Sequence, residues 1–199
     1  IAEDFIKNDN IALILGDNIF YGNNLTMIID EAMQLKEGAT IFAYAVKNPN
    51  RYGVVEIDNN NKPIKLIEKP IKTNSKLAIT GLYFFDKFAL QYAKQLKPSP
   101  RGEYEITELN KIYFDKNSLN VQIMGRGYAW FDAGTHSSLL EASQFISTIE
   151  NRQNFKIACP EEIAFTKKYI TESQLKELAD LYNKNDYGEY LLSLIKENL

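Results

Sequence analysis

Short apolar runs alternate with amphipathic segments along the first 150 residues, and this alternation constrains the fold most strongly. A short apolar run predicts a buried strand, whereas apolar residues spaced three and four apart predict a helix with one buried face. The strand-like runs span 10–15, 39–46, 54–58, 64–67, 78–85 and 119–124, and the helical segments span 25–36, 86–96, 104–115 and 136–149. Their order predicts an α/β fold with a largely parallel sheet, interrupted by one hairpin around the Asn-rich turn at 59–62.

The C-terminal part of the chain has a different pattern. From Pro160 onward the strand signal disappears, and three segments with charges on one face follow, at 161–168, 172–181 and 187–197. Each has the periodicity of an amphipathic helix. We therefore expect two domains, a partial α/β domain over residues 1–150 and a helical appendage over 151–199.

Charge and residue inventory exclude several classes of protein. The chain has 23 Lys and Arg against 26 Asp and Glu, a net charge of −3, which argues against nucleic-acid binding through bulk charge. With one cysteine, Cys159, and one histidine, His136, neither an internal disulfide nor a multi-cysteine or His-rich metal site is possible. No apolar run has the length of a membrane span, and no signal peptide is visible. We expect a cytoplasmic protein with neither nucleic acid nor membrane as its partner.

Two aspartates follow apolar runs, at the kind of position where open α/β sheets bind ligands. Asp17 comes just after the run at 10–15, and Asp132 ends the stretch 130–132 ahead of a helix. A pair of carboxylates would hold Mg²⁺ while phosphate oxygens fill its other positions. Position alone leaves a second interpretation open, in which Asp17 bonds a local turn and Asp132 favours the start of the helix.

Three loop motifs combine a cation with groups suited to a phosphorylated sugar: Arg51-Tyr52-Gly53, Glu68-Lys69-Pro70 and Arg101-Gly102-Glu103. Lys69 would reach a phosphate as a point charge, and Arg101 would clamp one bidentately. Glu68 would accept from a sugar hydroxyl, while Gly53 lets a ligand approach the main chain. Each motif also fits an ordinary solvated loop. The chain contains neither G-x-G-x-x-G nor a P-loop, which argues against a nicotinamide dehydrogenase and a P-loop NTPase.

The motifs occur in an order that is typical of one enzyme family. They are LGDNIFYG at 15–22, RYGVV at 51–55, EKP at 68–70, TGLY at 80–83, RGEYEIT at 101–107, GRGYAW at 125–130 and CPEEIA at 159–164. On these motifs, from about Ile11 to Leu194, the chain resembles the glucose-1-phosphate thymidylyltransferases. The ordered set is specific, although no single motif would be.

The resemblance implies a Rossmann-like mixed sheet of the sugar-nucleotide transferase type, with N-terminal strands missing and a C-terminal helical appendage. It implies that dTTP and glucose 1-phosphate react to dTDP-glucose and pyrophosphate by Mg²⁺-dependent in-line attack. The product would feed dTDP-rhamnose and bacterial surface polysaccharide. Since members of the family are usually homotetramers, we expect a homo-oligomer.

The resemblance also implies residue roles. Asp17 and Asp132 match the magnesium ligands. Lys69 and Arg101 match the clamp on the sugar phosphate and are the expected catalytic residues. The expected substrate-binding residues are Asn18, Tyr52, Gly53, Glu68, Lys69, Ile79, Thr80, Arg101 and Trp130.

One departure from the family pattern is large. The sequence begins at Ile1 and contains no G-G-x-G-T-R-L loop, which cradles the triphosphate in the family. We therefore expect an N-terminally truncated chain that keeps the sugar half and the carboxylates of the site and is inactive alone. Two alternatives are a metal-dependent glycosyltransferase, which would release a nucleoside diphosphate, and a non-catalytic sugar-phosphate-binding or oligomerisation module.

Overall fold

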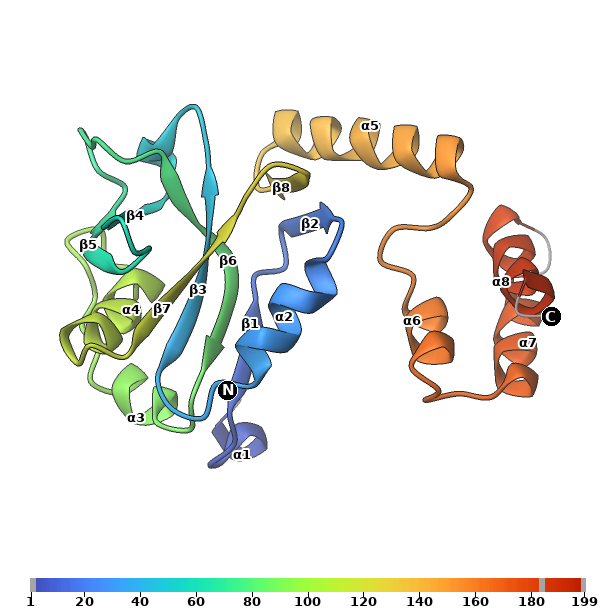
Figure 1. The fold of residues 1–199 in the computed structure, drawn as a ribbon, viewed down its shortest axis with the longest axis horizontal. Coiled ribbons are helices and arrows are strands. Elements are labelled where there is room, and N and C mark those ends of the chain that lie inside the picture. Colours follow the sequence, from blue (N-terminus) through green and yellow to red (C-terminus); the bar gives the residue numbers. More distant parts are fainter. Residues whose placement is uncertain (1–2, 183–184, 198–199) are drawn as a thin grey trace. The chain divides into compact units, whose positions relative to one another are not determined.

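The computed structural model describes residues 3–182 and 185–197, which form two compact units, one up to Leu139 and one from Leu140 onward (Figure 1). The first unit contains α1 (Glu3–Ile6), β1 (Ile11–Ile14), β2 (Asn18–Gly22), α2 (Leu25–Met33), β3 (Ala39–Ala45), the 3₁₀ helix η1 (Pro49–Arg51), β4 (Gly53–Ile57), β5 (Pro63–Glu68), β6 (Leu77–Phe85), α3 (Ala89–Ala93), α4 (Ile106–Asp115), β7 (Leu119–Met124) and β8 (Tyr128–Asp132). The division falls within α5 (His136–Gln153), whereas the sequence pattern places the boundary after residue 150. The second unit continues with α6 (Pro160–Thr166), α7 (Glu172–Leu181) and α8 (Asp186–Glu197).

A six-stranded mixed sheet forms the centre of the first unit. Its order is β5-β4-β6-β3-β7, and β1 also pairs with β6. The expected largely parallel arrangement is wrong: among the described strands only β3 and β7 pair in parallel, while β6 runs antiparallel to β1, β3 and β4. The reason is that β3, β4, β5 and β6 follow one another without an intervening α-helix, and parallel neighbours need a long crossover. The mixed sheet that the resemblance implies is therefore present.

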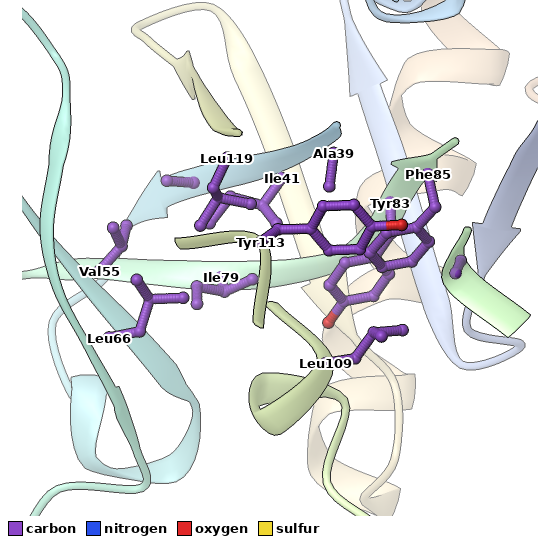
Figure 2. Packing of buried hydrophobic residues seen from close by; sticks show 12 residues of the cluster. Ala39, Ile41, Val55, Leu66, Ile79, Tyr83, Phe85, Leu109, Tyr113 and Leu119 are labelled. Atoms are coloured by element: carbon purple, nitrogen blue, oxygen red, sulfur yellow. The ribbon is translucent and has the colours of Figure 1, made fainter. Parts of the chain in front are cut away.

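Helices cover both faces of this sheet because its strands send alternate side chains to opposite sides. The core on one face, shown in Figure 2, combines β3 and β6 with α4, and its buried members include Ile41, Tyr83, Phe85, Leu109 and Tyr113. The core on the other face uses the intervening strand positions together with α2: Ala32, Phe42, Leu82, Phe84 and Met124. The sheet is thus the rigid layer from which the loops around the site extend.

A separate antiparallel ribbon pairs β2 with β8, and neither strand is expected from the sequence pattern. Asn18 lies opposite Asp132, and Phe20 lies opposite Trp130. Each strand has five residues, and every residue of β2 is half-buried, so a short apolar stretch without alternation of apolar and polar residues is its one local signal. The ribbon brings the segment after β1 beside the segment before α5.

A buried carboxylate fastens the end of β6 to the helices beside it. Asp86 is 4% exposed and accepts from the backbone N–H of Gly38 at 2.6 Å, from Tyr113 Oη at 2.7 Å and from the N–H of Phe88 at 3.0 Å. Three donors satisfy a charge that burial would otherwise penalise. Burial, and then the hydrogen bond to Asp86, raises the pKa of Tyr113.

The second unit has a small core of its own. Leu175, Ala179 and Leu191 are fully buried between α7 and α8, and Cys159 packs in the same cluster. Thr171 begins α7 with a capping box, in which its side chain and that of Gln174 each accept from the other's backbone N–H. Among the residues described, none of the helices combines the length and the apolar character that crossing a bilayer requires.

Candidate functional site

Asp17 and Asp132 come together where the β2–β8 ribbon ends. Asp17 directly precedes β2, Asp132 ends β8, and the carbonyl of Asp17 accepts from the N–H of Ala133 at 2.7 Å. A Cβ placed on Gly134 would lie 3.1 Å from Asp17 Oδ2 and 3.2 Å from Asp132 Oδ1. Both carboxylates therefore border the same small space, which glycine leaves open.

Asn18 links this carboxylate pair to the sheet. Its Oδ1 accepts from Trp130 Nε1 at 2.6 Å and from the backbone N–H of Gly81 at 2.9 Å. Its Nδ2 donates to Asp17 Oδ1 at 2.8 Å. A Cβ on Gly81 would lie 2.5 Å from Asn18 Cγ, so only glycine gives the amide its place against β6.

The β4–β5 hairpin supplies the second polar corner of the site. Gly53 lies opposite Glu68 in the register, and Thr107 of α4 donates its hydroxyl to Glu68 Oε2. A Cβ on Gly53 would lie 2.8 Å from Thr107 Oγ1 and 3.2 Å from Glu68 Oε2. Glycine at 53 therefore lets a strand, a helix and a carboxylate meet closely, and the buried threonine sets the orientation of Glu68.

Lys69 follows β5 with its backbone in the left-handed region, at φ 38°. Its N–H donates to the carbonyl of Tyr52 at 3.0 Å, which ties the end of β5 to the loop before β4. Its Nζ lies 3.8 Å from Glu68 Oε1, and 42% of the side chain is exposed. The ammonium is thus placed beside the carboxylate with donors still open to an anion.

A cavity of about 240 Å³ lies within the first unit. It is bordered by the Asp17–Asp132 pair and by Glu68 and Lys69 at the end of the β4–β5 hairpin. It is lined by every residue predicted for the site except Arg101, namely Asp17, Asn18, Tyr52, Gly53, Glu68, Lys69, Ile79, Thr80, Trp130 and Asp132. The buried hydroxyl of Thr80 has no hydrogen-bond partner among the described residues. Thr80 as a whole is fully buried in the lining of the cavity.

Arg101 lies in the loop between α3 and α4, close enough for the charge of Glu68 to act on it. Its guanidinium pairs with Glu103 and with Glu105, the latter at 2.9 Å from Nη2 to Oε1. It is not among the residues that line the cavity. Its role as a phosphate clamp therefore stays a prediction.

Trp130 and Tyr52 bring aromatic rings to the lining of the cavity, to which Tyr44 does not belong. The Trp130 ring centroid lies 5.1 Å from that of Tyr52 and 6.0 Å from that of Tyr44, in both cases with the rings edge to face. Burial raises the pKa of Tyr52; the Arg51 cation opposes this increase, and the Asp132 charge adds to it. Trp130 is 8% exposed, so its ring is largely shielded from water.

The carboxylate pair suits a hard divalent cation that shares its coordination with phosphates. No group of three or more His, Cys, Asp or Glu gathers as a metal cage in the part of the chain described. Two converging carboxylates match the way Mg²⁺ is bound, through one or two protein oxygens with substrate phosphates and water completing the shell. The donor set of Asp17 and Asp132 therefore fits Mg²⁺.

The comparison with family models decides the classification, since the model described as nucleotidyl transferase matches residues 1–149. The chain belongs to the nucleotidyl transferase family. The match covers the whole cavity-bearing unit.

Curated relatives place the chain more closely within the nucleotidyl transferases. The glucose-1-phosphate thymidylyltransferase of Neisseria meningitidis is 53% identical over 197 residues, which are 99% of this chain and 68% of the relative. That of Xanthomonas campestris is 52% identical over 196 residues, 98% of this chain and 66% of the relative. The chain thus spans about two thirds of the length of these relatives.

Solved structures show the same nucleotidyl transferase fold. One is a Bacillus anthracis protein described as a candidate glucose-1-phosphate thymidylyltransferase in complex with a sucrose. It aligns with a TM-score of 0.65 and 42% identity, and the alignment covers 72% of this chain and 57% of that one. A UDP-glucose pyrophosphorylase complexed with UDP-glucose aligns with a TM-score of 0.62 over 74% of this chain and 59% of that one, at 19% identity. The second likeness concerns the fold alone.

Several residues of this nucleotidyl transferase cavity were not predicted as site residues. Thr107 lies on the buried side of α4, and Gly81 lies inside β6. A glycine within an apolar strand is a signal of close approach by another group, and it points to Gly81. Thr107 has no comparable signal, because its hydroxyl becomes important only once α4 packs beside β5.

Proposed function

We propose that this chain carries the sugar-phosphate and carboxylate half of a glucose-1-phosphate thymidylyltransferase site. The observation that carries the proposal is the single cavity onto which the Asp17–Asp132 pair and the Glu68–Lys69 corner both open. The Asp17–Asp132 pair suits a metal-bound phosphate, and the Glu68–Lys69 pair suits a sugar with its phosphate. The identity to relatives of that name supports the same assignment.

The sugar would lie against the β4–β5 corner. Glu68, held by Thr107, would accept hydrogen bonds from sugar hydroxyls through its second oxygen. The unpartnered Thr80 hydroxyl would bond the sugar or its phosphate. Lys69 would bind the phosphate as a compact charge and hold it in place.

The reaction asks mainly for positioning and charge neutralisation. An oxygen of the sugar phosphate would attack the α-phosphorus of dTTP. The new P–O bond forms as the bond to the β-phosphate oxygen breaks, and pyrophosphate leaves with the electron pair. Asp17 and Asp132 would hold Mg²⁺, which supplies charge neutralisation for the nucleotide phosphates.

Turnover would also need groups that cradle the triphosphate. The 199 residues contain no G-G-x-G-T-R-L sequence, and the described cavity offers Lys69 and Arg51 as its cations. We therefore propose that the chain binds glucose 1-phosphate but does not turn over alone. A cytoplasmic location, a homo-oligomeric state and a place in dTDP-rhamnose synthesis belong to the same proposal.

Two measurements on the chain test this function. Pyrophosphate release is followed with glucose 1-phosphate, dTTP and Mg²⁺, and glucose 1-phosphate binding is followed by calorimetry. Binding of glucose 1-phosphate without release of pyrophosphate supports a half-site. Release of pyrophosphate supports the reaction but contradicts the requirement for the G-G-x-G-T-R-L loop. Absence of both overturns the proposal, as would release of a nucleoside diphosphate from a nucleotide sugar, the signature of a glycosyltransferase.

The carboxylate assignment has its own test in a longer version of the chain that includes the triphosphate loop. Asp132→Asn keeps the size of the side chain and removes its charge. We expect it to lose turnover with Mg²⁺ while its circular dichroism stays that of the parent. Retained activity would remove Asp132 from the metal site.

A further inference from the structure

We propose that Asn18 is a positioning residue that orients the Asp17 carboxylate toward Asp132, and that Trp130 and Gly81 set the orientation of its amide. The inference deepens the proposed function and rests on its carboxylate pair. It gives Asn18 a role beyond lining the cavity.

The orientation of the Asn18 amide follows from the chemistry of its neighbours. The Trp130 indole N–H and the Gly81 backbone N–H are donors only, and both lie within 2.9 Å of the same amide atom. That atom must be the oxygen, because the amide nitrogen would place donor against donor. The two bonds fill both lone pairs of Oδ1, so it has none left for a substrate hydroxyl.

The amide nitrogen is consequently turned toward Asp17. Its Nδ2 donates to Asp17 Oδ1 at 2.8 Å, and this bond occupies one carboxylate oxygen. The other oxygen, Oδ2, borders the space beside Gly134, where Asp132 Oδ1 also lies. Asn18 thus holds the far oxygen of Asp17 and leaves the near one for a cation.

The surroundings keep this arrangement rigid. Asn18 and Asp132 are cross-strand partners, and Trp130 lies on the same face of β8, two residues from Asp132. The Trp130 ring packs edge to face against Tyr44 and Tyr52, which restricts the indole that holds the amide. The chain of bonds Trp130–Asn18–Asp17 therefore spans the ribbon and ends at the carboxylate.

Mn²⁺ binding followed by electron paramagnetic resonance tests this role without a turnover assay. Asn18→Ala removes the bond to Asp17, and we expect about 10-fold weaker Mn²⁺ binding, the usual effect of losing a hydrogen bond to a ligand side chain. Trp130→Phe keeps the aromatic packing and should weaken Mn²⁺ binding less, in the same direction. Tyr44→Phe is the matched control, because it loses a hydrogen bond to the carbonyl of Tyr128 in the same ribbon but leaves Asn18 untouched.

A second measurement does not depend on a metal. Trp130 is the single tryptophan, so its indole N–H gives one unambiguous proton signal. Its exchange with water should be slow in the parent and in Tyr44→Phe, and fast in a folded Asn18→Ala. Fast exchange in the parent would overturn the bond from which the amide orientation follows.

The outcomes separate this inference from the proposed function. Parent-like Mn²⁺ affinity in folded Asn18→Ala and in Trp130→Phe would overturn the role of Asn18. It would not contradict the proposed metal site at Asp17 and Asp132. Absence of Mn²⁺ binding by the parent would overturn the metal site itself and the positioning role with it. Weakening in both variants, with Tyr44→Phe unchanged, supports the inference.

Discussion

At the scale of single residues, the cavity depends on side chains whose partners hold them in one orientation. Glu68 accepts from Thr107, and Asp17 accepts from Asn18, so each carboxylate has one oxygen engaged by the protein. Lys69 is different, because Glu68, at 3.8 Å, is the one acidic residue within ion-pair distance among the residues that the structure describes. Substitution of Lys69 should therefore change ligand binding much more than folding.

Lys69→Ala should weaken glucose 1-phosphate binding about 10-fold or more, since a charged hydrogen bond to phosphate contributes about 1.5–3 kcal/mol. dTTP binding should change far less. Calorimetry with each ligand measures both effects. Lys65→Ala is the control, because Lys65 lies in β5, just before Lys69 in the chain, but outside the cavity lining. Equal losses for the two ligands would contradict the assignment of Lys69.

Thr107→Val keeps the shape of the side chain but removes the donor to Glu68. The half-buried Glu68 carboxylate would lose this donor, so we expect weaker glucose 1-phosphate binding and a loss of about 1–3 kcal/mol in the free energy of unfolding. Urea denaturation and calorimetry measure the two effects. Thr107→Ser retains the hydroxyl and should remain close to the parent; parent-like binding by Thr107→Val would show that Glu68 needs no such support.

At the scale of elements, the ribbon and the sheet junctions determine where the carboxylates lie. The β2–β8 register places Asn18 opposite Asp132, and a shift by one residue would turn Asp132 to the other face. At the start of β3, Gly38 has φ +101° and donates to the buried Asp86. Backbone geometry at these junctions is therefore as important as the side chains it presents.

Gly38→Ala should destabilise the first unit. A Cβ there would lie 2.3 Å from the carbonyl oxygen of Ser118, and left-handed backbone adds a cost of about 1–3 kcal/mol for a residue other than glycine. The free energy of unfolding in urea, followed by Trp130 fluorescence, measures the loss. Gly125→Ala is the matched control, because nothing lies within 4 Å of its Cβ, and an equal loss in both variants would contradict the steric explanation.

At the scale of the whole molecule, each unit has its own core with buried tyrosines. Burial, followed by the charge of Glu68, raises the pKa of Tyr83, and burial with a hydrogen bond to Glu162 raises that of Tyr190. Tyr113 is shifted in the same direction. Both units therefore depend on tyrosines that remain protonated.

Raised tyrosine pKa values predict unfolding at alkaline pH. Above about pH 10 the unfolded chain loses tyrosine protons that the folded chain retains, so stability is full below pH 10 and falls as pH rises. The loss is up to about 1.4 kcal/mol per pH unit for each such tyrosine. Urea denaturation at pH 8 and pH 11 measures it. Tyr83→Phe should reduce the pH dependence, and an unchanged dependence would contradict the contribution of Tyr83.

The amino-acid sequence by itself indicated the strands of the main sheet, the helices from α2 onward and the short motifs that carry polar groups. Those features follow from local periodicity and residue type, which neighbouring residues are sufficient to specify. It also indicated that Asp17, Glu68, Lys69 and Asp132 belong to one site, through the resemblance of ordered motifs.

The tertiary structure alone decided the strand directions, the β2–β8 ribbon and the contacts that orient the site. The bond between Asn18 and Trp130 joins residues 112 positions apart, and the bond between Thr107 and Glu68 joins residues 39 positions apart. No local pattern encodes such pairs, because each forms only when sheet packing brings two distant segments together. The ion pairs of Arg101 with Glu103 and Glu105 are likewise decided by the fold, while its role as a phosphate clamp stays a prediction.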